Sequence, residues 1–310
     1  MISLPHAFVL LAALISQTRA ACTTPTVRVS WTTLTAAQKQ AYFDADLCLM
    51  NTPGQLGSII PGVVSRYDDL IAVHQQQGNV LAGTDTWHVT GQFLSVHRYY
   101  VHAHEVLLRT ECGYTGPIPY WDEVVDAGAF STSSVVADFG GVGDASGNIV
   151  SGPFANHVCH LGPQGTATNH VLQRAINEGE ASRCSAFNLN TALSKTAFNG
   201  FQSWIYDTIH RGGHAGIGLD MFDLMTSPND PLFFLHHAYL DKIWAGWQAV
   251  DPATRTYDLR NVGYETQAVP PGGLVPTNNG TVLWIYGILP NSTVAEVADI
   301  KAGYLCYTYQ

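Results

Sequence analysis

The 310 residues carry a net charge of −10 at neutral pH and only 14 lysines and arginines, and charged side chains make up 12% of the chain. So little positive charge disfavours nucleic acid and acidic membrane surfaces as partners, because both are bound mainly through Lys and Arg. After the first 20 residues, no apolar stretch has the length that a membrane span requires.

The N-terminus reads as a targeting segment. The apolar run Leu4–Ile15 precedes a small-residue cleavage site, which predicts a signal peptide over residues 1–20 and a secreted mature chain. No linker or internal repeat divides residues 21–310, so we expect a single domain. Asn279 and Asn291 begin N-x-S/T sequons, which favour an exposed, glycosylated C-terminal region.

All six cysteines lie in the predicted mature chain. An even number of cysteines in a secreted protein favours disulfides, and six cysteines allow 15 pairings. Of these pairings we favour Cys22–Cys306, Cys48–Cys112 and Cys159–Cys184.

The first two predicted helices cover Thr33–Met50 and Val63–Gln76. Thr35 is placed to cap the first helix. The second helix has an apolar stripe at helical spacing that ends at His74. Taken alone, His74 is more simply explained as a buried polar residue of the core.

A third helix follows a short loop and contains several histidines. His88 lies just before this helix, which Thr90 is placed to cap, and His97 lies inside it. These two histidines could meet the one on the preceding helix in a single pocket. His104 lies two turns from His97, about 10.5 Å along the axis. We therefore predict that neither His102 nor His104 binds the same ion.

The stretch Phe130–Cys184 is rich in Gly, Ser and Asn and is predicted to be mostly irregular. Its segment from His157 to His160 resembles a metal-binding tract, with one cysteine between the two histidines. We assign that cysteine to a disulfide instead, and predict no metal there.

A second constellation of histidines lies downstream. His210 and His214 are four residues apart, which places both imidazoles on one helix face. Gly212 and Gly213 between them are unfavourable inside a helix, so we expect the helix to end here and another group to approach the backbone closely. Taken alone, this spacing fits two surface polar residues equally well.

The next helix supplies a third imidazole. Asp230 can cap it and Pro231 fits its first position. His237 then lies on the same face as Asp241, one turn later. We expect the Asp241 carboxylate to accept the ring N–H of His237 and so fix its tautomer.

Two all-imidazole trios suit copper, zinc or iron, whereas Mg²⁺ and Ca²⁺ prefer oxygen ligands. Zinc hydrolases usually have a glutamate close to the metal ligands. Neither trio has a glutamate within one helical turn on the same face. Neutral imidazoles without a carboxylate favour a redox-active copper ion. Two such ions close together could share one dioxygen and take electrons from a phenol.

The motifs resemble those of the type-3 copper proteins, the tyrosinase and catechol oxidase family. His88-x8-His97-Arg98 is similar to the copper-A motif of the family, and His210-x3-His214 together with D-P-L-F-F-L-H-H-A-Y-L-D is similar to its copper-B motif. The resemblance implies a mainly α fold in which a four-helix bundle houses a dinuclear copper site, with long irregular loops and a few short strands. Residues 21–310 would form one tyrosinase-like catalytic domain.

The same resemblance implies the ligands of the two coppers. It gives His74, His88 and His97 for copper A, and His210, His214 and His237 for copper B. His236 is then only a neighbour of the site, because the ligand of the family lies four residues before the aspartate. Tyr307-Thr-Tyr309 resembles the Tyr-x-Tyr that closes the domain, and Arg28 is expected to pack near it.

Departures from the family pattern bear on activity. Thr86 stands where many members have a thioether-linked cysteine, so no thioether is expected. Arg211 and Phe201 stand where efficient tyrosinases carry an asparagine and a water-holding glutamate, and this loss should weaken phenol deprotonation. Leu224 takes the position of the gate over copper A, and Ala215, like Arg211, should line the entrance.

The resemblance therefore implies a short, secreted, fungal-like form that lacks the C-terminal shielding domain of longer relatives. We expect two copper ions, oxidation of o-diphenols (catechols) to o-quinones with reduction of O2 to water, and weak hydroxylation of monophenols. A full tyrosinase is the alternative within this class. A haemocyanin-like O2-binding protein and a zinc hydrolase are alternatives from other classes.

Overall fold

The computed structural model describes residues 22–79 and 85–310. The predicted signal peptide lies outside the described residues. The helices are α1 Ala36–Asn51, α2 Arg66–Gln77, α3 Phe93–Glu111, α4 Ser134–Asp138, α5 Glu178–Ala181, α6 Ala186–Ser194, α7 Phe198–Ile205, α8 Arg211–Ile217, α9 Leu232–Val250, α10 Pro252–Arg255 and α11 Val294–Ala298. The strands are β1 Thr26–Ser30, β2 Pro119–Tyr120, β3 Val158–Cys159, β4 His170–Val171, β5 Val282–Leu283, β6 Ser292–Thr293 and β7 Tyr307–Tyr309.

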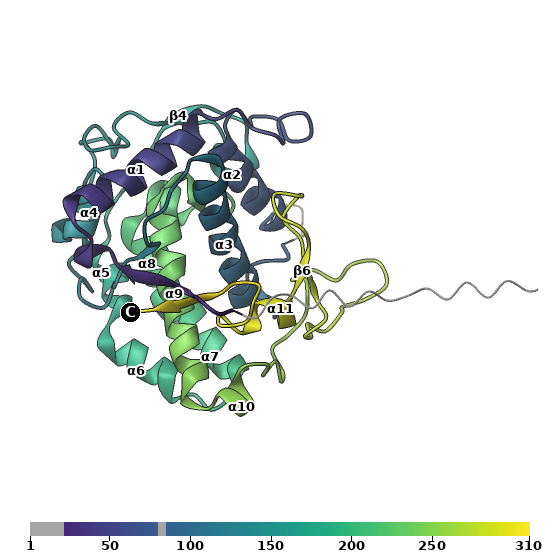
Figure 1. Cartoon of the computed structure of the whole chain (residues 1–310). Coiled ribbons are helices and arrows are strands. Elements are labelled where there is room, and N and C mark those ends of the chain that lie inside the picture. Colours follow the sequence, from purple (N-terminus) through teal and green to yellow (C-terminus); the bar gives the residue numbers. More distant parts are fainter. Residues whose placement is uncertain (1–21, 80–84) are drawn as a thin grey trace, which may run out of the picture.

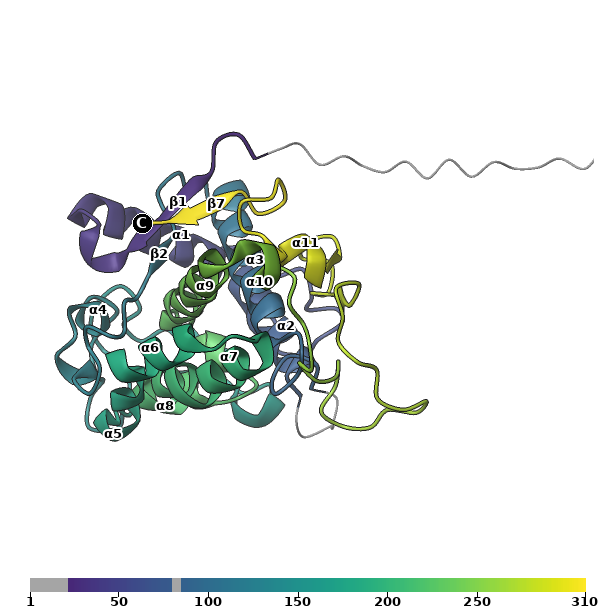
Figure 2. The same cartoon turned by 90° about the horizontal axis from the view of Figure 1, so that it is seen from below.

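Four helical segments form the centre of the molecule. They are α2, α3, α9 and the segment in which a π-helical turn, Tyr206–His210, joins α7 to α8. Helices α3 and α9 lie side by side (Figures 1 and 2), α1 packs on α2 and α3, and α6 packs on α7 and α9. The mainly α fold with a four-helix bundle, irregular loops and short strands is confirmed. None of the helices in the described ranges is long and apolar enough to cross a membrane.

Local sequence signals set most helix starts. Thr35 caps α1 through a reciprocal pair of hydrogen bonds with Gln38, as predicted. The expectation that Thr90 caps α3 is wrong, because its hydroxyl donates to the carbonyl of Thr86 and the helix begins at Phe93. Asp230 accepts the backbone N–H of Leu232 at the start of α9, which agrees with its predicted capping role.

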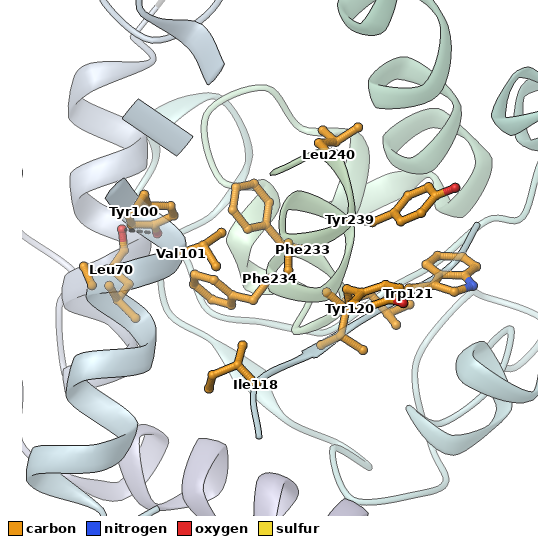
Figure 3. Close-up of a cluster of buried hydrophobic side chains, with 14 of the residues drawn as sticks. Leu70, Tyr100, Val101, Ile118, Tyr120, Trp121, Phe233, Phe234, Tyr239 and Leu240 are labelled. Atoms are coloured by element: carbon orange, nitrogen blue, oxygen red, sulfur yellow. Dashed lines mark hydrogen bonds between the residues drawn. The ribbon is translucent and has the colours of Figure 1, made fainter. Parts of the chain in front are cut away.

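The core between the long helices is aromatic. Figure 3 shows Phe233 and Phe234 of α9 directed toward Tyr100 and Val101 of α3, all of them buried. The hydroxyl of Tyr100 donates to the carbonyl of Leu70 on α2 at 2.7 Å, so its one polar atom is paired. This packing fixes the positions of the three helices relative to one another.

A three-stranded sheet joins residues from the two ends of the described chain. Strand β1 lies between β2 and β7 and pairs with both in parallel. The guanidinium of Arg28 lies 3.6 Å from the centroid of the Tyr307 ring and donates to the Tyr309 hydroxyl at 3.1 Å. The expected packing of Arg28 near the Tyr-x-Tyr segment is confirmed.

Two of the three predicted disulfides are present and one is wrong. Cys22 is bonded to Cys306 and Cys48 to Cys112, whereas Cys159 and Cys184 are free and buried. The thiol of Cys184 lies 3.4 Å from the carboxylate of Glu123. Cys159 instead lies beside the imidazole–carboxylate pair of β4 and the turn after α8. The two thiols therefore lie in different parts of the core, and their positions in the sequence do not indicate this.

We therefore expect two titratable thiols in the mature chain. Both are inaccessible in the native state, so a thiol reagent should react with fewer than one group per chain before unfolding and with two groups in denaturant. The measurement is a colorimetric thiol count with and without guanidinium. A count of zero in denaturant without reductant would contradict the pairing described here.

Candidate metal centre

The first trio of predicted histidines comes together from two helices and a loop. His74 lies on α2, His97 on α3, and His88 in the loop just before α3. Their ring centroids are 4.9 to 5.8 Å apart, and one ring nitrogen of each lies within 4.8 Å of those of the others. All three side chains are buried.

Hydrogen bonds to backbone carbonyls orient these rings. The Nδ1–H of His74 donates to the carbonyl of Met225 at 2.9 Å, and that of His97 donates to Phe93 at 2.8 Å. Because Nδ1 carries the proton in both rings, each Nε2 presents a lone pair, and both Nε2 atoms are buried without a partner. His88 Nδ1 lies 3.4 Å from the carboxylate of Asp85.

The second group contains four histidines rather than three. His210 ends the π-helical turn, His214 lies on α8, and His236 and His237 lie on α9. The Nδ1–H of His214 donates to the carbonyl of Met221 at 2.6 Å. Its Nε2 lies 3.1 Å from the Nε2 of His237, close to the about 3.3 Å between two nitrogens that each lie about 2.05 Å from one tetrahedral ion.

A buried carboxylate holds the fourth imidazole. The Nδ1 of His236 donates to Oε1 of Glu123 at 2.5 Å, and both side chains are fully buried. The Nε2 of His236 has no partner. Glu123 was not predicted, because it belongs to a turn after β2, far from the histidines in sequence, and carries no recognisable pattern.

Burial keeps most of these imidazoles neutral. It lowers the pKa of His74, His97, His210, His214 and His237 well below 6.5, and the neighbouring imidazoles lower it further. A neutral imidazole has a free lone pair, which is the form that binds a metal ion.

The two groups face each other across the bundle. The ring of His97 stacks on that of His237 with centroids 4.3 Å apart and planes 13° apart. Phe233 packs against His237 at 4.2 Å and edge-on against His74 at 5.2 Å. Two clusters of imidazole donors with unpaired buried nitrogens fit a pair of copper ions, because neither cluster contains a carboxylate or thiolate ligand.

The predicted role of Asp241 is wrong. Its carboxylate accepts from Arg98, from Arg28 at 3.3 Å and from the Tyr307 and Tyr309 hydroxyls at 2.5 Å each. The Nδ1 of His237 has no hydrogen-bond partner. Helical spacing places Asp241 one turn after His237. Two buried arginines, Arg98 of α3 and Arg28 of β1, bind its carboxylate instead. Asp241 therefore joins α9 to α3 instead of orienting a ring.

A cavity of about 230 Å³ opens onto the histidines. Its lining residues are His88, Tyr206, Asp207, His210, Arg211, His214, Phe222, Asp223, Leu224 and Ser227. Arg211 and Leu224 therefore lie at the entrance as predicted. Ala215 is buried and does not line this cavity, so its predicted place at the entrance is wrong. Phe201, at the position of the family's glutamate, lies in the core and stacks on Trp247 at 5.0 Å.

The two glycines of the second motif lie inside a helix that continues to Ile217, so the predicted helix end is wrong. The expected close approach is confirmed. A Cβ on Gly213 would lie 2.3 Å from the ring of His236, and one on Gly212 would lie 2.8 Å from the sulfur of Cys184. Helix α8 can approach α9 this closely only because neither residue has a side chain.

Replacing Gly213 by alanine should destabilise the protein by about 1 to 3 kcal/mol, because the new methyl overlaps a ring that Glu123 holds in place. The matched control is Gly246→Ala on the exposed side of α9, where a Cβ meets nothing within 4 Å. That change should stabilise the helix by about 0.5 to 1 kcal/mol. Urea unfolding of both variants measures the difference, and equal midpoints would contradict the contact.

The remaining histidines singled out above lie outside both clusters. His104 pairs with Asp46 at 2.7 Å and stacks on Phe234, while His102 packs near Tyr304. His160 pairs with Asp68 at 2.9 Å. The structure therefore places His102, His104 and His160 outside the two histidine clusters.

Residues 64–250 match the common central domain of tyrosinase. The chain is 33% identical to Tyrosinase ustQ of Aspergillus flavus, over 93% of this chain and 80% of that protein. It is 29% identical to N-acetyl-6-hydroxytryptophan oxidase ivoB of Emericella nidulans, over 92% of both chains.

Solved structures show the same relationship. A variant of polyphenol oxidase from Thermothelomyces thermophila superposes with a TM-score of 0.83 at 29% identity, over 92% of this chain and 89% of that chain. A functional unit of octopus hemocyanin shares the fold, with a TM-score of 0.59 at 23% identity, over 92% of this chain and 68% of that chain. With the histidine clusters and the family match over the whole bundle, the chain belongs to the tyrosinase family of type-3 copper proteins.

Proposed function

We propose that this tyrosinase-family oxidoreductase oxidises o-diphenols to o-quinones with O2 as the electron acceptor. The proposed ligands are His74, His88 and His97 for one copper ion, and His210, His214 and His237 for the other. The buried Nε2 atoms of His74, His97 and His210, which have no partner, and the 3.1 Å between the Nε2 atoms of His214 and His237 support this assignment. His236 is proposed to stay unbound, because Glu123 holds its Nδ1, whereas the Nε2 of its helix neighbour His237 lies 3.1 Å from the Nε2 of His214.

The observation that carries the proposal is the cavity beside the two clusters. His88 of the first cluster and His210 and His214 of the second line its wall, so a small phenol in the cavity reaches both. A protein that only carried O2 would need no such opening. Its volume of about 230 Å³ suits a single aromatic ring with a short substituent.

When bound, a pair of copper ions would supply the redox couple that moves electrons from the o-diphenol to O2. The chain provides the binding geometry. Backbone carbonyls hold the imidazoles of His74, His97 and His214 in one tautomer, and the aromatic packing of Phe233 excludes water from the inner side. Two o-diphenols lose four electrons and four protons in total, which convert one O2 to two waters.

Weak hydroxylation of monophenols is part of the proposal. Deprotonation of a lone phenol, whose pKa is about 10, needs a base near the site. Phe201 occupies the position where the family resemblance implies a water-holding glutamate, and it is buried in the core. The carboxylates on the cavity wall belong to Asp207 and Asp223 instead. An o-diphenol depends less on such a base.

We also propose that the protein is secreted. Two disulfides support an oxidising compartment, and Asn279 and Asn291 of the sequons are both exposed. Recovery of glycosylated protein from the culture medium of an expressing fungus, beginning near Ala21, tests this point. Intracellular protein that retains residues 1–20 would argue against it.

Oxygen uptake by the copper-loaded protein with 4-methylcatechol and with its monophenol counterpart tests the proposed reaction. We expect prompt uptake with the catechol and a long lag or no rate with the monophenol. Comparable rates on both would identify a full tyrosinase. Reversible O2 binding without turnover would indicate a carrier, and zinc in place of copper after expression would reopen the hydrolase alternative.

A further inference from the structure

The cavity beside the histidines carries an unequal set of charges. Two carboxylates line it, Asp207 from the π-helical turn and Asp223 from the turn after α8, together with one guanidinium, that of Arg211. Among the described residues that line this cavity, Arg211 is the only lysine or arginine. Its guanidinium lies 5.9 Å from the ring of Phe222, at the rim.

A residue outside the cavity engages this guanidinium. Glu180 of α5 accepts from Nε of Arg211 at 3.0 Å and from Nη2 at 3.2 Å, which is a two-point pairing. Helix α5 packs against α8, so the pair is held by tertiary contact. This pairing occupies the Nε–Nη2 edge of the guanidinium and offsets its positive charge at the cavity mouth. Glu180 also accepts from Arg183 at 2.7 Å.

The two carboxylates are held differently. Asp223 accepts three backbone N–H groups, from Gln164 at 3.1 Å, Met225 at 3.0 Å and Thr226 at 2.8 Å. These bonds fix it against the turn while its negative charge remains at the cavity wall. Asp207 is exposed and lies one helical turn before Arg211. It is the carboxylate with the freedom to meet a substituent of a bound phenol.

Building on the o-diphenol oxidation proposed above, we propose that this cavity selects catechols with a positively charged side chain over catechols with a carboxylate. The attraction comes from Asp207 and Asp223. The rejection of anions comes from the same two residues together with the pairing of Arg211 to Glu180. The net charge of −10 adds a weaker, long-range preference of the same sign.

Coulomb attraction sets the size of the effect. A unit charge about 7 Å from one carboxylate in water changes affinity by about threefold, and salt reduces it over a Debye length of about 8 Å at physiological ionic strength. With two carboxylates and an incompletely neutralised guanidinium, we expect kcat/KM for the cation to exceed that for the anion by about tenfold at low salt.

The experiment uses the copper-loaded full chain and three catechols of similar size. They are 4-(2-aminoethyl)catechol, neutral 4-methylcatechol and 3,4-dihydroxyphenylacetate. The neutral compound reports the oxidase activity itself, so its failure would reject the proposed function and not the charge preference. NMR-detected binding of phenethylammonium and phenylacetate to the metal-free protein provides a readout that does not depend on turnover.

Two variants separate the contributions. Asp207→Asn should reduce the cation-to-neutral ratio of kcat/KM by about threefold. Glu180→Gln should raise kcat/KM for the anion by about threefold relative to the neutral catechol, because it releases Arg211 toward the cavity. Asp44→Asn on α1 is the matched control, since Asp44 is exposed and does not line the cavity, and it should leave all three ratios unchanged.

A preference for the cation that falls with added salt, together with both variant effects, supports the proposal. Equal or higher kcat/KM for the anion in the wild type would overturn it. The proposal would also be overturned if the cation-to-neutral ratio of kcat/KM changed neither with added salt nor in Asp207→Asn. N-acetyl-6-hydroxytryptophan, the compound in the name of one relative, carries a carboxylate, and its preferential oxidation would likewise reject the charge preference.

Discussion

His237→Ala is expected to hold one copper ion per chain instead of two and to lose o-diphenol oxidation by more than the about 10- to 100-fold that follows the loss of an outer-shell partner of a metal ligand. The reason is geometric. The Nε2 of His237 lies 3.1 Å from that of His214, and its ring stacks on His97 of the other cluster. Its removal therefore takes a donor nitrogen from the second cluster, at the point where that cluster contacts His97 of the first. Copper quantitation after dialysis, followed by oxygen uptake with 4-methylcatechol, measures both effects.

The adjacent residue provides the control. His236→Ala should retain two copper ions per chain, because Glu123 holds the Nδ1 of His236, whereas the Nε2 of His237 lies 3.1 Å from that of His214. It should lose stability, since the carboxylate of Glu123 is fully buried and would lose its imidazole partner. If His236→Ala loses copper and His237→Ala keeps it, the proposed ligand of the second copper is wrong.

Asp241→Ala should destabilise the protein by about 3 to 5 kcal/mol. Arg28 and Arg98 are both fully buried and both donate to this carboxylate, so its removal leaves buried positive charge uncompensated. Arg98 is next to His97 on α3, and Asp241 lies one turn after His237 on α9. The ion pair between Arg98 and Asp241 therefore links α3 to α9, the two helices that carry these ligands. Urea unfolding of the metal-free, disulfide-bonded protein measures the change.

The pH dependence of this effect has a defined sign. Burial acts to raise the pKa of Asp241, but Arg98 and Arg28 outweigh it and hold the pKa below its usual range. A carboxyl group whose pKa is lower in the folded state stabilises the fold fully above its unfolded pKa, about 3.9. The stability difference between wild type and Asp241→Ala should therefore be constant from about pH 5 to 8. It should shrink as the pH falls below about 4.

Asp44→Ala on the exposed side of α1 is the control for both the unfolding measurement and its pH dependence. It should change the free energy of unfolding by less than about 0.5 kcal/mol. If Asp241→Ala matched this value, the buried ion-pair network would not contribute to stability as described.

Most of the metal centre could be predicted from the sequence because its signals are local. The spacing of His210 and His214, the pair of motifs around His97 and His237, and the cap at Thr35 each lie within a few helical turns. The two trios were therefore assigned without a structure, whereas the four-helix bundle that carries them was implied by the family resemblance. The family resemblance added the packing of Arg28 on the Tyr-x-Tyr segment, which helical periodicity alone does not imply.

Several errors came from contacts between residues far apart in the chain. Helical spacing suggested that Asp241 orients His237, but Arg98 lies 143 positions away in sequence and takes the carboxylate. The favoured pairing of Cys159 with Cys184 is wrong because their thiols face different neighbours, Asp220 and His170 for Cys159 and Glu123 for Cys184. Phe201 stands at the position of the family's glutamate, yet its ring packs in the core against Trp247.

By itself the sequence determined which side chains are available for the chemistry: two groups of imidazoles, most of them inside predicted helices. Short-range periodicity is enough for this, because a helix places residues three and four apart on one face. Tertiary structure alone decided that the trios face each other, that Glu123 holds His236, and that Glu180 engages the guanidinium at the cavity mouth. Each of these joins separate elements, and only the packing of the helices and loops brings such groups within bonding distance.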